Sequence, residues 1–141
     1  MRVSSILLTM SCGVTLLLGV VHLAYTFIGT RLDPRASDCR AAMESTTLVL
    51  TRETTIWRAW IGFNASHAFG AILFGLVYGY LAIFRPDVLF GSLFLLAVGL
   101  TLLLGYAVLG KLYWFRVPYR AILAATFLYC AALVGAAFGI V

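Results

Sequence analysis

Four long apolar stretches constrain this chain more than any other feature of its sequence. They cover about residues 4–28, 57–84, 88–110 and 121–141, and each could cross the roughly 30 Å hydrocarbon core of a bilayer as a helix. Hydrophobic residues make up 63% of the 141 residues and charged residues only 11%, whereas soluble domains are about a quarter charged. We therefore predict an all-α integral membrane protein, a four-helix transmembrane bundle forming one domain over residues 1–141.

The segment 29–56 is the only long polar stretch between the apolar ones. Asp33-Pro34 is typical of a turn, and Ser37 could cap a helix that begins near Asp38. We expect a short amphipathic helix in this first loop, lying on the membrane surface. The apolar run after Met1 is longer than the apolar region of a signal peptide, so we expect the first helix to be retained.

The positive charges predict an orientation in the membrane. Loops of a membrane protein that carry excess Lys and Arg face the cytoplasm. Eight of the ten Lys and Arg residues lie in or beside the loops at 29–56 and 111–120, so these loops are predicted to be cytoplasmic and both termini outside. The net charge of +5 reflects this topology, and we expect the lipid bilayer, not a nucleic acid, as partner. The eight residues are Arg31, Arg35, Arg40, Arg52, Arg58, Lys111, Arg116 and Arg120.

Polar side chains gather at one depth inside the apolar segments. The stretch from Trp57 to Gly70 carries Asn64 and His67 three residues apart, and His22 lies in the first segment. With a helical rise of about 1.5 Å per residue, both histidines lie about 9 to 15 Å from the loop at 29–56. Polar groups inside a membrane are costly and often mark sites. His22 is the predicted neighbour of Asn64 and His67.

Small residues predict where helices pack closely. Gly62, Ser66 and Gly70, followed by Gly75 and Gly79, recur along the second apolar segment. Such small-xxx-small surfaces let helix backbones approach each other in lipid. We expect this helix to pack centrally, and its small-residue faces could also join a homo-oligomer or a larger membrane complex.

The polar cluster has several interpretations. It could only join the helices by hydrogen bonds. It could bind a lipid, quinone or sterol-like amphiphile. Two histidines could also be the axial ligands of a haem b, whereas a catalytic metal would need a third ligand. A transporter or channel is a further alternative, but no inverted repeat is visible. The candidate ligand-binding residues are His22, Asn64, His67, Tyr25, Tyr129 and Glu53, with His22 and His67 as the alternative haem ligands.

We therefore favour a non-enzymatic accessory or ligand-binding membrane protein, and we assign no catalytic residue. The Trp-x5-Phe-Asn-x-Ser-His-x2-Gly pattern within residues 57–70, together with Gly19-Val20-Val21-His22-Leu23 and the Arg-Glu-Thr-Thr run at 52–55, resembles a family of small bacterial four-helix inner-membrane proteins. The resemblance spans nearly the whole chain. It implies the fold and the membrane location, and it implies no activity.

Overall fold

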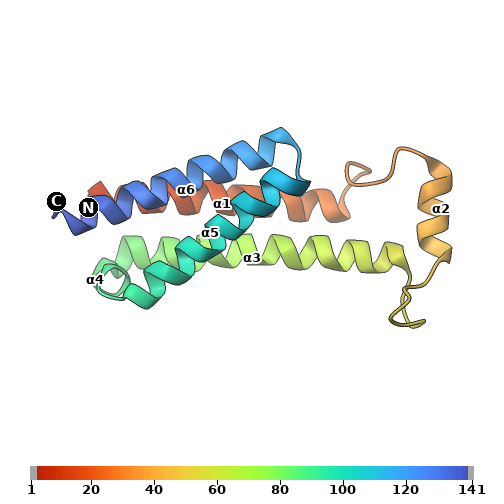
Figure 1. Ribbon diagram of the computed structural model, residues 1–141, viewed down its shortest axis with the longest axis horizontal. Helices are drawn as coiled ribbons and strands as arrows, with labels where there is room; N and C mark the ends of the chain where they lie inside the picture. Colours follow the sequence, from red (N-terminus) through yellow and green to blue (C-terminus); the bar gives the residue numbers. More distant parts are fainter. Residues whose placement is uncertain (1–2, 140–141) are drawn as a thin grey trace. The chain divides into compact units, whose positions relative to one another are not determined.

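The computed structural model describes residues 3–139, and this part of the chain is helical without a strand (Figure 1). Four of its helices are long and apolar enough to cross a membrane, which confirms the predicted all-α class with four such segments. The short helix predicted in the first loop is also present. The helices are α1 (Val3–Phe27), α2 (Ser37–Ser45), α3 (Ile56–Phe84), α4 (Pro86–Phe90), α5 (Leu93–Tyr113) and α6 (Arg116–Ala137).

The third apolar segment differs from its prediction at both ends. Instead of one helix from residue 88 to 110, α4 ends at Phe90 and α5 runs from Leu93 to Tyr113. The break occurs because Ser92 is extended, with φ −112° and ψ 101°, and its side chain accepts a hydrogen bond from the amide of Leu95. A serine in this position caps a new helix, which hydropathy alone does not reveal.

The fourth helix begins earlier than predicted. It starts at Arg116 rather than residue 121, so that only two residues separate it from α5. Pro118 lies in its first turn, where the missing amide of a proline has no helical partner to lose. The predicted end at residue 141 falls outside the described residues. In α2, Ser37 is the first helical residue and does not cap the helix; its hydroxyl donates to Asp38.

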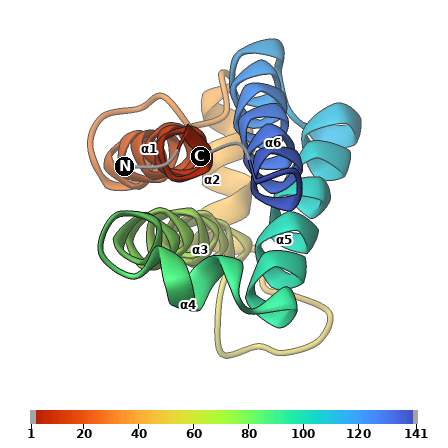
Figure 2. The same cartoon turned by 90° about the vertical axis from the view of Figure 1, so that its left-hand side faces the viewer.

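The chain divides into two compact units, and the boundary between them runs through both α1 and α3. The first unit comprises residues 1–18 and 71–141, and the second comprises residues 19–70. Figure 2 faces the end of the first unit, where α1, α3, α5 and α6 stand around a common centre.

Two of the buried tyrosines in the core of the first unit bond to the backbone of α5. The hydroxyl of Tyr78 donates to the carbonyl of Leu95 at 2.7 Å, and that of Tyr129 donates to the carbonyl of Leu96 at 3.0 Å. Both rings crowd Gly99, where an added Cβ would lie 2.4 Å from the Tyr129 hydroxyl. The glycine is therefore required for the two tyrosines to reach the α5 backbone.

Close contact between α1 and α3 in the same unit depends on Gly75. A Cβ added there would lie 2.6 Å from the Cβ of Leu16 and 3.0 Å from the carbonyl oxygen of Cys12. Gly79 stands one turn further on, also facing Cys12. The prediction that small residues of this helix allow close packing is confirmed for this half of α3. At Gly62, in the other half, no described atom beyond the neighbouring residues and the nearby backbone of the helix itself lies within 4 Å of an added Cβ. Contact with a second chain there stays a prediction.

The second unit is held together by Arg40 of α2. Its guanidinium bonds Asp33 in the preceding loop and Glu44 one turn ahead, the latter at 2.9 Å. The same group lies 4.0 Å from the centre of the Trp57 ring, at the start of α3. These contacts stabilise α2 against the N-terminal end of α3. A bridge between Thr47 and Thr55 closes the rest of the loop.

Candidate functional site

The polar cluster of the second unit is built around a bond between α1 and α3. Nε2 of His22 lies 3.0 Å from Oδ1 of Asn64. The amide nitrogen of Asn64 donates to the carbonyl of Trp60 at 2.8 Å, which fixes the amide with its oxygen toward the histidine. Because that oxygen can only accept, Nε2 of His22 must carry the proton. Asn64 is buried, with 9% of its surface exposed, and both ends of its amide are used.

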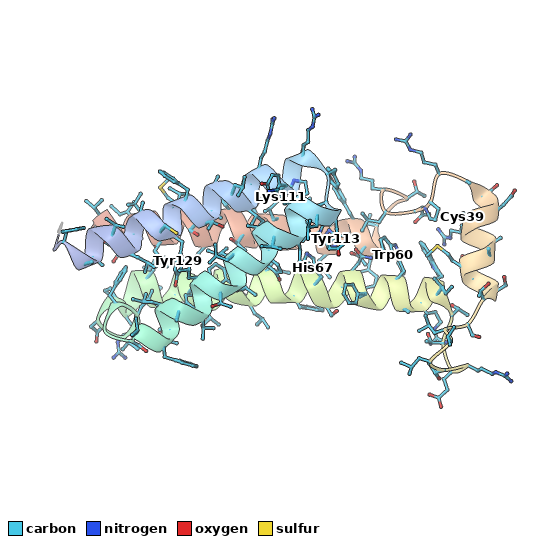
Figure 3. All side chains as sticks on the ribbon, in the orientation of Figure 1. Cys39, Trp60, His67, Lys111, Tyr113 and Tyr129 are labelled. Carbon is cyan, nitrogen blue, oxygen red and sulfur yellow. The ribbon has the colours of Figure 1, made fainter. Side chains whose placement is uncertain are left out.

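His67 lies beside this pair. Its ring centre is 5.4 Å from that of His22, and the two rings meet edge to face at 77°. Asn64 and His67 are three residues apart on α3, so they share the face that meets α1. His67 is only half-buried, whereas Asn64 is buried. The structure therefore brings together the three residues that were predicted to be neighbours. Figure 3 labels His67 on α3.

Two further contacts hold the cluster in place. The hydroxyl of Thr26 donates to the carbonyl of His22 at 2.8 Å, within α1. The indole nitrogen of Trp60 donates to the carbonyl of Leu32 at 3.3 Å, which ties the loop after α1 to α3. Trp60 thus contributes its carbonyl to the cluster and its indole to the loop above it. Nothing in the sequence indicates this backbone contact of Trp60.

Of the other predicted ligand-binding residues, Tyr25 is on α1, Glu53 is in the first loop and Tyr129 is in the first unit. The Tyr25 hydroxyl accepts a hydrogen bond from Arg31 at 3.0 Å, and the guanidinium also lies over the tyrosine ring. Glu53 is exposed in the first loop. Tyr129 belongs to the first unit, where it is fully buried beside Tyr78. Equal depth along the helices, the basis of the prediction, does not specify which face of a helix a side chain occupies.

The geometry of the two histidines does not fit a haem. Two axial ligands lie on opposite faces of the macrocycle, so the macrocycle must separate their rings. Here the rings contact each other directly, and Nε2 of His22 is directed at Asn64 instead of toward a shared centre. Among residues 3–139, no three side chains of the His, Cys, Asp and Glu types are grouped as a metal site requires.

Comparison with protein-family models, curated proteins and solved structures finds no match for this chain. The resemblance of residues 57–70 to a family of small membrane proteins therefore stays a prediction. Function has to be inferred from the cluster itself.

Proposed function

We propose that this chain is an integral membrane protein that binds a carbonyl-bearing amphiphile of the quinone type at the cluster of His22, Asn64 and His67, without chemical turnover. The single observation that carries the proposal is the bonded His22–Asn64 pair with the half-buried His67 ring against it. A pair that only joined two helices would be complete with His22 and Asn64. His67 adds a third polar side chain to the same face, half-buried and in contact with the His22 ring.

The surroundings of His67 suit an apolar tail. Phe63 lies one turn before His67 on α3 and exposes 74% of its surface. An imidazole N–H can donate to a quinone carbonyl, and the adjoining aromatic side chain can cover the ring or the tail. The Asn64 amide restrains His22, and His22 in turn restrains the His67 ring. Because these contacts exist without a ligand, they favour a preformed site over one that assembles on binding.

Membrane insertion and orientation belong to the same proposal. We place the four long apolar helices across a bacterial inner membrane, with the first loop and the α5–α6 connection in the cytoplasm, as the distribution of positive charge favours. Cys39, exposed on α2, provides a natural probe of that loop. A membrane-impermeant maleimide should label it only after the cells are permeabilised, and Cys39→Ser should abolish the labelling. Labelling of Cys39 in intact cells would show that the protein has the opposite orientation.

Quinone binding can be measured by quenching of tryptophan fluorescence. In a Trp114→Phe background the signal comes from Trp57 and Trp60, which lie in the second unit. A short-chain quinone should quench this signal saturably in detergent micelles. His67→Phe should weaken binding about tenfold, equivalent to about 1.4 kcal/mol for one lost hydrogen bond. His67→Gln, which keeps a donor, should retain most of the affinity.

The control for this experiment is Tyr129→Phe, which removes a hydroxyl from the first unit and leaves the cluster intact. It should bind the quinone as the unaltered protein does. Equal affinity in the His67→Phe variant would contradict the proposal and leave the cluster as a purely structural contact. A Soret band that disappears in His22→Ala and His67→Ala would contradict it in favour of haem.

A further inference from the structure

A second candidate site lies in the first unit, at the end that holds α4. An open cleft of about 700 Å³ is lined by residues of α4, the start of α5, the end of α6 and the first turn of α1. This volume is within the range of about 300 to 1,000 Å³ that is usual for small-molecule sites. Its lining is mostly apolar and includes Phe90, Leu93, Leu96, Leu100 and Leu133.

Ser4 gives this cleft a buried polar group. The residue lines the cleft, exposes 2% of its surface, and its hydroxyl has no hydrogen-bond partner among the residues that the structure describes. The hydroxyl lies against Gly135 of α6, where an added Cβ would be 2.9 Å away. A buried hydroxyl without a partner is unfavourable, and a ligand with an acceptor group relieves that cost.

The rim of the cleft carries one charge of each sign. Asp87 lines the cleft and Arg85 pairs with it at 3.5 Å. Both side chains are well exposed, at 71% and 56% respectively. A zwitterionic phosphoethanolamine headgroup matches this pair, since its phosphate can approach the guanidinium and its ammonium the carboxylate. Charged, hydrogen-bonding and apolar groups, the three kinds of contact that a phospholipid makes, thus border or line one cleft.

We propose that this cleft binds one phosphatidylethanolamine molecule, with an acyl chain in the cleft, an ester carbonyl accepting from Ser4, and the headgroup at Arg85 and Asp87. The site is separate from the cluster at His67 and does not depend on it. The bound lipid contacts α1, α4, α5 and α6 together, so it adds a shared contact to the end of the unit.

Native mass spectrometry after delipidation tests this site. The protein is incubated with equal amounts of phosphatidylethanolamine and phosphatidylglycerol of the same acyl chains. One phosphatidylethanolamine should remain bound at the collision energy that removes the rest. Ala97→Phe, which places a ring in the cleft from an exposed lining position, should reduce that bound fraction at least tenfold. Val98→Phe, the neighbouring exposed position outside the lining, should leave it unchanged.

The polar contacts are tested separately. Ser4→Ala should reduce retention about fivefold, and Arg85→Gln with Asp87→Asn should remove the preference over phosphatidylglycerol while leaving the acyl contact. Equal retention in the Ala97→Phe and Val98→Phe variants would overturn the proposal, because it would indicate loosely bound lipid around all helices. Equal retention of the two lipids by the unaltered protein would overturn the headgroup assignment, as would exclusive retention of a free fatty acid.

Discussion

Buried polar groups are used differently in the two units of this chain. In the first unit, Tyr78 and Tyr129 donate to backbone carbonyls of α5 and are closed in by tight packing. In the second unit, His22 and Asn64 bond through their side chains, and the neighbouring His67 stays half-buried. Backbone acceptors are always present in a helix, whereas a side-chain pair beside an accessible ring is a specific arrangement. The first pattern stabilises a fold, and the second is suited to recognition.

The largest effect is expected at Gly99. Gly99→Ala puts a Cβ within 2.4 Å of the Tyr129 hydroxyl and 2.7 Å of the Tyr78 ring. We expect it to lower the free energy of unfolding by about 1–3 kcal/mol, the usual cost of overpacking. Thermal unfolding in detergent measures this. Gly105→Ala on the same helix is the control and should cause no loss, because only neighbouring residues and the nearby backbone of the helix itself lie within 4 Å of the new Cβ among the described residues. Equal stability of the Gly99→Ala and Gly105→Ala variants would show that the tyrosine contacts at Gly99 do not stabilise the fold.

A smaller loss of stability is expected at Asn64. Asn64→Leu leaves the Nε2–H of His22 without its acceptor. It should lower the free energy of unfolding by about 1 kcal/mol, because hydrogen bonds between membrane helices contribute little each. A double-mutant cycle with His22→Leu should give a coupling of about 0.6 kcal/mol or more. If the effects of the two substitutions on stability were additive, the His22–Asn64 bond would contribute nothing to stability. The contrast between the two units would then be wrong.

Arg40 should affect order in the first loop more than global stability. Arg40→Lys keeps the charge but loses the planar group that contacts Asp33, Glu44 and Trp57 at once. We expect faster amide hydrogen exchange over residues 37–45 and unchanged exchange in α6. Arg35→Lys, at an arginine of the same loop with no ion pair or ring contact among the described residues, serves as the control. Unchanged exchange in α2 would contradict the proposed tethering.

The smallest effect concerns pH. The bond to Arg85 holds the pKa of the Asp87 carboxyl below its usual range. This pair therefore contributes stability above the ordinary carboxyl pKa and loses it as the pH falls through the lowered pKa. Arg85→Gln should raise the pKa of Asp87, which carboxyl NMR shifts would follow. Because both groups are exposed, global unfolding should change little between neutral pH and pH 5.

Sequence reasoning predicted the helical class, the apolar segments and the neighbourhood of His22, Asn64 and His67, because hydropathy and helical spacing report on these directly. It missed the break at Ser92, which depends on a side-chain cap, and the early start of α6, whose first turn contains Arg116 and Pro118. It also grouped Tyr129 with the histidines by depth alone. Depth along a helix follows from residue number, but partners across helices depend on rotation and packing.

The central claim is that the cluster of the second unit binds a quinone-type amphiphile, and a photoreactive quinone analogue tests it most directly. After irradiation in membranes and proteolysis, the account predicts crosslinks in residues 19–27 and 60–70 that are lost in His67→Phe and kept in Tyr129→Phe. Crosslinks distributed over α5 and α6, or unchanged by His67→Phe, would contradict it.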